Sequence, residues 1–190
     1  MQLGNCGVKH SWLDFSAAFD HVNHEALIFK LRQLGLGGAF LSILIEFLTD
    51  RVQRVVVDGH YSAWRSVISG VPQGSVLGPL LFILYTHDMW FGLENMLVSY
   101  ADDATLLAVV PSPDMRSVIS DSLNRDLAKI SEWCRLWGMK MNPNKTQSMI
   151  VSRSRTLQPQ HPNLFIDNVP LTTNDAFKIL GVTFDSTFTF

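Results

Sequence analysis

The sequence has little cysteine, little charge and no long hydrophobic run. Its two cysteines, Cys6 and Cys134, are too few for a disulfide scaffold among 190 residues and are typical of a reducing compartment. The longest apolar run covers residues 76–85 and is interrupted by Gly78-Pro79, whereas a membrane span needs roughly 18 residues. The first ten residues lack the apolar core of a signal peptide. These absences predict a soluble intracellular protein, cytoplasmic or nuclear, with no membrane partner.

Charged residues make up 17% of the chain, whereas a typical globular domain has about 25%. Hydrophobic residues make up 47%, so a chain of this length can bury roughly two-thirds of its unfolded surface. The shortage of charge indicates that a neighbour covers part of the apolar surface. The net charge of −2 gives no overall attraction for nucleic acid, so binding of nucleic acid requires a local basic face.

Helical and strand patterns are interleaved along the chain. Asn23 is a typical N-cap, Asp58-Gly59 suits a tight hairpin turn, and the apolar residues of 114–137 recur at spacings of three and four. The patterns predict helices over 23–34, 39–48, about 79–90 and 114–137, hairpins over 54–68 and 96–110, and strands over 8–15, 147–151, 163–169 and 176–184. Strands joined partly by hairpins predict an α+β fold with a mainly antiparallel sheet packed on helices.

Acidic residues in two separate stretches are candidates for a metal site. Asp102 and Asp103 are adjacent between apolar residues, near the bend of the second hairpin. Burying two unpaired like charges is costly, but a divalent cation would use both carboxylates as the hard oxygen ligands that Mg²⁺ prefers. Asp14 stands where a strand is expected to end. An ordinary acidic turn at 102–103 and a helix cap at Asp14 are the alternatives, since spacing alone does not show that the sheet brings these acids together.

A third stretch, residues 69–79, combines glycines with a polar side chain. Gly70 and Gly74 flank Gln73, which allows the backbone to approach a ligand closely just before a helix begins. The alternative is an ordinary loop with a helix cap at Ser75.

Three motifs occur in a fixed order: LDFSAAFD at 13–20, SGVPQGSVLGP at 69–79 and YADD at 100–103. Together they resemble the palm domain of reverse transcriptases, above all those of non-LTR (LINE-type) retrotransposons, and more distantly those of group II introns. The resemblance extends from about residue 13 to 185. It implies an RNA-directed DNA polymerase that uses an RNA template, a DNA primer and deoxynucleotide triphosphates, with two Mg²⁺ ions, for which Mn²⁺ is a possible substitute.

The resemblance also implies roles for the acidic residues and their neighbour. Asp14 and Asp102 match the two metal-binding aspartates of the palm, and Asp103 matches the third family acid, close to the metals and the primer end. Phe15 would offer its backbone carbonyl to a metal.

Further roles follow for the nucleotide and the primer. Phe19 matches the bulky gate against the ribose 2′-hydroxyl, Gln73 lies over the incoming nucleotide, and Tyr100 packs beneath the primer–template. Lys145, in the motif GMKMNPNKT, is the candidate for the triphosphate, and Gly181 belongs to a strand pair that grips the primer. The alternatives are a core aromatic for Phe19, a buried hairpin tyrosine for Tyr100, a solvated lysine for Lys145 and an ordinary strand around Gly181. Candidate phosphate contacts are Arg51, Arg54, Arg65, Arg153 and Arg155.

The expected organisation is an atypical lead over 1–12, a palm core over 13–151, a polar linker over 152–162 and primer-grip-like strands over 163–190. Relatives of this kind carry basic fingers before the first aspartate and a helical thumb after the palm. We therefore expect the fingers to be largely absent and the thumb to be missing here, both supplied by a longer parent protein. The strand before Asp14 is apolar in the family but reads GVKHSW here. The alternative function is a catalytically inactive retrotransposon remnant that only folds or binds RNA or a partner.

Overall fold

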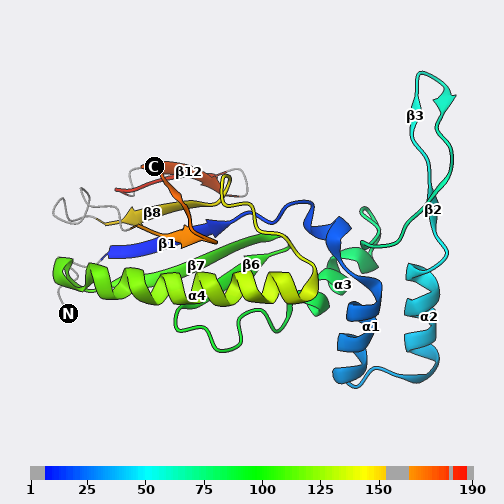
Figure 1. Cartoon of the computed structure of the whole chain (residues 1–190), viewed down its shortest axis with the longest axis horizontal. Coiled ribbons are helices and arrows are strands. Elements are labelled where there is room, and N and C mark those ends of the chain that lie inside the picture. The colour runs from blue at the N-terminus through cyan, green and yellow to red at the C-terminus, as the bar shows by residue number, and fades with distance from the viewer. Residues whose placement is uncertain (1–6, 153–162, 180–181, 188–190) are drawn as a thin grey trace. The chain divides into compact units, whose positions relative to one another are not determined.

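The structure is a computed structural model that describes residues 7–152, 163–179 and 182–187 (Figure 1). Gly181 and nearly all of the expected linker lie outside the described residues. The described chain forms two compact units. The first consists of the described residues within 1–16, 89–136 and 140–190, and the second consists of 17–88 with 137–139.

The first unit contains a five-stranded sheet in the order β11-β8-β1-β7-β6. Its strands are β1 (Gly7–Leu13), β6 (Met96–Tyr100), β7 (Asp103–Val110), β8 (Gln147–Val151) and β11 (Thr172–Thr173). β1 pairs antiparallel with both β7 and β8, and β6 pairs antiparallel with β7. Only the short β11 runs parallel to its neighbour β8 within this sheet. The prediction of a mainly antiparallel sheet with helices is therefore confirmed.

One face of this sheet is covered by α4 (Arg116–Trp137), which follows the short 3-10 helix η2 (Pro113–Met115) (Figure 1). Alternate residues of β1 and β7 are buried, as the two-residue period of a strand requires when one face is covered. The core contributed by α4 consists mainly of Leu123, Leu127, Ile130 and Cys134. The buried carboxylate of Asp126 accepts hydrogen bonds from the backbone N–H groups of Glu94 (2.9 Å) and Asn95 (2.8 Å), which holds the chain that enters β6.

Two small hairpins complete the first unit. β9 (Phe165–Ile166) pairs with β10 (Val169–Pro170), and β12 (Ala176–Ile179) pairs with β13 (Val182–Asp185). The prediction of one continuous strand over 163–169 is wrong. Asp167 and Asn168 have φ angles of 49° and 66°, left-handed values that these two residue types tolerate, and they reverse the chain between β9 and β10.

The second unit is mostly helical, with one long hairpin. Its helices are η1 (Ala18–His21), α1 (His24–Gln33), α2 (Gly38–Leu48) and α3 (Leu77–Thr86). The predicted N-cap is confirmed, because the Asn23 side chain accepts a hydrogen bond from the Ala26 N–H at 2.9 Å. α3 ends earlier than the expected Trp90. At its end Thr86 Oγ1 donates to the Phe82 carbonyl, and the His87 ring nitrogen bonds to the Leu84 carbonyl, so local side chains take part in its termination.

A buried lysine holds the second unit together. Lys30 Nζ donates to the Tyr85 carbonyl (2.8 Å) and to the Asp88 carboxylate (2.5 Å), and it lies 3.8 Å from the centre of the Trp137 ring. The Tyr85 hydroxyl in turn donates to the Trp137 carbonyl. Across the parts of the chain that the structure describes, no helix combines the length and the hydrophobicity that crossing a membrane would require.

Candidate active site

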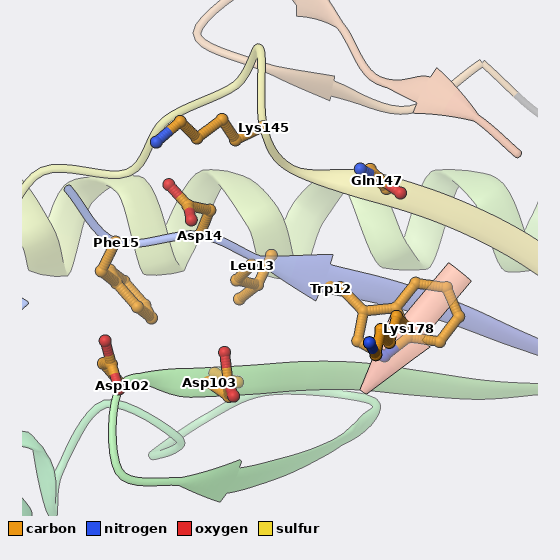
Figure 2. Close-up of a pocket in the computed structure, with 10 residues that line it drawn as sticks. Trp12, Leu13, Asp14, Phe15, Asp102, Asp103, Lys145, Gln147 and Lys178 are labelled. Atoms are coloured by element: carbon orange, nitrogen blue, oxygen red, sulfur yellow. The ribbon is translucent and has the colours of Figure 1, made fainter. Parts of the chain in front are cut away.

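Strand pairing brings the three candidate aspartates of the first unit together. Leu13, the last residue of β1, is the partner of Ala104 in β7. Asp14 follows Leu13 and Asp103 precedes Ala104, so continuing this register places the two acids opposite each other. Asp102 lies in the two-residue turn between β6 and β7, closed by the pair Tyr100–Asp103. All three aspartates line one pocket of about 320 Å³ (Figure 2).

The pocket opens on the sheet face opposite α4. Leu13 and Ala104 point into the core under α4, so Asp14 and Asp103, one position away on each strand, project from the other face. Figure 2 shows Asp102 and Asp103 on one side of the pocket and Asp14 with Lys145 on the other. The remaining lining residues are Trp12, Leu13, Phe15, Ala104, Gln147 and Lys178.

A compact turn over residues 142–146 positions Lys145 beside Asp14. The Asn142 N–H donates to the Asp14 carbonyl at 2.8 Å, and the Asp14 N–H donates to Thr146 Oγ1 at 3.2 Å. The turn is closed on itself, because the Asn142 carbonyl accepts from the N–H groups of Lys145 (3.1 Å) and Thr146 (2.9 Å). The motif around Lys145 is thus fixed to the motif around Asp14 by hydrogen bonds to the backbone of Asp14, although the two are far apart in the sequence.

The three carboxylates of the pocket interact electrostatically. Burial raises the pKa of Asp103, and the negative charges of Asp102 and Asp14 raise it further. Both neighbouring aspartates therefore act on Asp103, as expected for a site whose repulsion a cation would relieve. The lysines that line the same pocket, Lys145 and Lys178, both have exposed side chains.

The donor set fits magnesium bound together with phosphates. Within residues 7–152, 163–179 and 182–187, no three His, Cys, Asp or Glu side chains are close enough to hold one metal ion by themselves. Mg²⁺ rarely uses such an all-protein cage, and is usually held by one or two carboxylates with water and substrate phosphates. Asp14, Asp102 and Asp103 offer this kind of donor, and Phe15 also lines the pocket.

Phe19 and Gln73 belong to the second unit and do not line the pocket of the three aspartates. The Phe19 ring stacks on Phe82 with ring centres 4.6 Å apart, a contact that agrees with its alternative role as a core aromatic. The Gln73 side-chain amide donates to Asp20 at 3.1 Å. Gln73 and Asp20 line a second pocket of about 470 Å³ within this unit.

The loop before α3 requires glycine at position 70. The φ angle of Gly70 is +88°, and a Cβ at this position would lie 2.9 Å from the Asp20 Cα atom. The close approach is held by hydrogen bonds from the Gly70 N–H to the Val22 carbonyl (2.7 Å) and from the Val71 N–H to the Phe19 carbonyl (2.9 Å). The glycine-rich motif is therefore packed directly against the segment that carries Phe19.

Tyr100 is 68% exposed at the end of β6, so the alternative interpretation as a buried hairpin tyrosine is wrong.

Several residues that line the pocket of the aspartates were not predicted from the sequence. Trp12 and Gln147 are partners across β1 and β8, on the same face as Asp14. The two-residue period of a strand was the signal for Trp12, which lies two positions before Asp14, whereas Lys145 lies in a turn and gives no such signal for Gln147. Lys178 comes from the distant β12, and no local pattern indicates its place.

Comparison with solved structures identifies the architecture. The fold resembles apo telomerase from Candida tropicalis truncated from its C-terminal domain, with a TM-score of 0.58 and 14% identity over 95% of this chain and 34% of that one. It also resembles telomerase from Candida albicans in complex with a TWJ fragment of telomeric RNA, with a TM-score of 0.58 and 18% identity over 95% and 29%. At these identities the likeness shows the fold alone, and it agrees with a polymerase palm.

The sequence defines the family. Residues 8–184 match the reverse transcriptase (RNA-dependent DNA polymerase) family, and the chain belongs to it. It is 34% identical over 187 residues to a probable RNA-directed DNA polymerase from transposon BS of Drosophila melanogaster, covering 94% of this chain and 20% of that protein. It is 28% identical over 191 residues to a Pol polyprotein from the type-1 retrotransposable element R2 of Popillia japonica, covering 92% and 30%. The predicted kinship with non-LTR retrotransposon polymerases is confirmed, and the chain spans about a fifth of the first of these relatives.

Proposed function

We propose that this chain is the palm of an RNA-directed DNA polymerase that adds deoxynucleotides to the 3′ end of a DNA primer on an RNA template. The observation that carries the proposal is the convergence of Asp14, Asp102 and Asp103 on one pocket of a palm-like sheet. Membership of the reverse transcriptase family supports the same reaction class. An RNA template also agrees with the fold of telomerase from Candida albicans, which was solved with a fragment of telomeric RNA.

Two Mg²⁺ ions, or Mn²⁺ as a substitute, are the proposed cofactors. Asp14 and Asp102 would hold them, Asp103 would add charge beside them, and the Phe15 carbonyl would be a further oxygen donor. The chemistry that bound magnesium supplies is a lower pKa for the primer 3′-hydroxyl and neutralisation of the leaving pyrophosphate. The contribution of the protein is the preorganised placement of these donors at the ends of paired strands.

The nucleotide and primer contacts form the rest of the proposal. Lys145, held beside Asp14 by its turn, would bind the triphosphate and donate a proton to the leaving pyrophosphate. Gln73 would lie over the incoming nucleotide, and Phe19 would exclude a ribose 2′-hydroxyl. Tyr100, whose ring is exposed, would pack beneath the primer–template, with the strand pair around Gly181 holding the primer.

Primer extension tests this function directly. The assay uses the full chain, an RNA template with an annealed DNA primer, deoxynucleotides and either Mg²⁺ or Mn²⁺. We expect extension by the natural sequence and none by Asp102→Asn, while Asp121→Asn, a change at an exposed acid of α4, leaves extension intact. Primer extension by the Asp102→Asn variant would contradict the assignment of the metal site. If the natural sequence extends no primer with either ion, polymerase activity of this chain is contradicted.

Metal binding can be tested apart from activity. Fe²⁺ bound in place of Mg²⁺ generates hydroxyl radicals that cut the nearby backbone in the presence of ascorbate and peroxide. We expect cuts near residues 12–15 and 101–104, suppressed by excess Mg²⁺ and absent from Asp102→Asn. Cuts spread evenly along the chain would show that the pocket does not bind the ion.

A further inference from the structure

A long hairpin of the second unit combines exposed aromatic rings with arginines. It consists of β2 (Val52–Gln53), β3 (Val56–Val57), β4 (His60–Tyr61) and β5 (Arg65–Ser66), with β2 paired to β5 and β3 paired to β4. The predicted hairpin is confirmed, and its turn is the expected Asp58-Gly59, both with positive φ angles (49° and 78°). Figure 1 shows the hairpin extending from the helices of its own unit.

The exposed rings and one arginine form a single cluster on this hairpin. The guanidinium carbon of Arg54 lies 4.0 Å from the centre of the Tyr61 ring and 4.5 Å from the centre of the Trp64 ring. Tyr61 is 61% exposed and Trp64 is 58% exposed. These large rings therefore contribute little to the core, and the Arg54 guanidinium lies within cation–π distance of both.

The charge of the hairpin is opposite to that of the rest of the chain. Residues 51–66 contain three arginines and one aspartate, a formal charge of +2, whereas the whole chain is −2, which leaves −4 for the remainder. The hairpin is thus the local basic face that the overall composition does not provide. A hairpin with this positive charge attracts a polyanion, and its arginines offer planar hydrogen-bond donors to phosphate oxygens.

The base of the hairpin leads into the pocket that holds Gln73. Arg51 is fixed there, because its guanidinium donates to the Leu48 carbonyl (3.2 Å) and the Gly70 carbonyl (2.8 Å). The pocket of about 470 Å³ is lined by Arg51, Gln53 and Ser66 from the hairpin, and by Asp20 and Gln73. The hairpin therefore carries the aromatic cluster and also contributes three residues to the lining of this pocket.

We infer that the hairpin 51–66 binds single-stranded RNA, with bases stacked on Tyr61 and Trp64 and phosphates contacted by Arg54 and Arg65. Stacking rings combined with cations that follow a backbone are the usual means of binding single strands without reading their sequence. The inference rests on the proposed function, since the single strand would be the unpaired part of the template. It assigns template binding to a part of the chain that contains none of the catalytic aspartates.

Fluorescence anisotropy with a labelled 12-nucleotide single-stranded RNA tests the inference on the full chain. We expect Tyr61→Ala and Trp64→Ala each to weaken binding by about 5- to 150-fold, the range that corresponds to the removal of one stacking ring. Trp64→Phe should restore most of the affinity, because phenylalanine keeps a stacking face. Phe40→Ala removes an equally exposed aromatic ring from α2 of the same unit and should leave binding unchanged.

The salt dependence separates the roles of charge and stacking. Arg54→Ala should lower the slope of log affinity against log salt by about 0.7, the value for one phosphate contact to a single strand. Arg32→Ala, a change at an exposed arginine of α1, should leave the slope unchanged. Circular dichroism of each variant confirms that the fold is retained, as the exposure of these side chains leads us to expect.

The outcomes distinguish this inference from the proposed polymerase function. RNA binding that depends on the hairpin and persists in Asp102→Asn supports the inference whether or not the chain extends a primer. Unchanged RNA affinity in Tyr61→Ala and Trp64→Ala overturns it. Variants that alter self-association of the chain but not RNA affinity also overturn it, because the hairpin would then be a protein interface.

Discussion

Lys9 is a buried lysine in the five-stranded sheet. It points from β1 into the core under α4 and is 1% exposed, and in the described chain its Nζ has no hydrogen-bond partner. Burial lowers the pKa of Lys9 from 10.5 to about 7. At about 1.4 kcal/mol for each unit of pKa, the protonated side chain destabilises the fold by about 4–5 kcal/mol near neutral pH. This is a large fraction of the roughly 5–15 kcal/mol that stabilises a typical protein.

Replacing Lys9 by methionine keeps an unbranched apolar stem and removes the charge. We expect Lys9→Met to raise the free energy of unfolding by about 4 kcal/mol at pH 7, measured by urea titration with circular dichroism. The matched control is Lys140→Met, which removes a positive charge at an exposed position of the same unit and should change stability little.

The pH dependence gives a second, sharper test. Because the pKa of Lys9 is lower in the folded state, the unfolded chain binds more protons between about pH 7 and 10.5, and stability rises with pH across this window. The advantage of Lys9→Met over the natural sequence should therefore shrink by about 3 kcal/mol between pH 7 and pH 9.5. An advantage that stays constant with pH, or a variant no more stable than the Lys140→Met control, would show that the Lys9 ammonium reaches water or a partner.

Three further substitutions test other parts of the fold and the site. Asp126→Ala leaves the N–H groups that enter β6 without their acceptor, and urea titration should show a loss of about 3 kcal/mol, against little change in an Asp121→Ala control. Lys30→Met removes the ammonium from the Asp88 carboxylate and should cost about 2–3 kcal/mol in the same assay; an unchanged midpoint would contradict the role of this ion pair in the second unit. Asp103→Asn should raise the melting temperature at pH 7.5 in the presence of a metal chelator. The reason is that the pKa of Asp103 is raised in the fold, so its ionised carboxylate destabilises the folded state. The gain in melting temperature should vanish at low pH, where the carboxyl group is protonated. An equal gain at both pH values would refute the electrostatic explanation.

The strand before Asp14 contains polar residues whose burial could be judged only from the structure. The polar segment GVKHSW departs from the apolar strand that the family resemblance implies. In the structure it still pairs with β7 along its length and with β8 from Val8 to Trp12, and alternation places Lys9 and Ser11 on the buried face. The sequence showed that these residues were unusual, but only the register showed which of them are buried.

Local signals in the sequence determined much of this protein. The Asn23 cap, the Asp58-Gly59 turn, the helix period before Trp137 and the acid pair at a hairpin bend depend on a few neighbouring residues, and each was confirmed. The family could be identified for the same reason, because its motifs are short contiguous strings.

Which distant residues share a site depends on the long-range pairing of the chain. Asp14, Lys145 and Lys178 meet because three separate segments of the first unit come together, and no local spacing encodes that meeting. Residues 163–170 likewise form a hairpin and not one strand, because Asp167 and Asn168 adopt left-handed backbone angles that a strand pattern does not reveal. Backbone propensity acts over a few residues, so helices, strands and turns could be predicted from the sequence. A pocket depends on the pairing of distant segments, so the assembled site could be seen only in the structure.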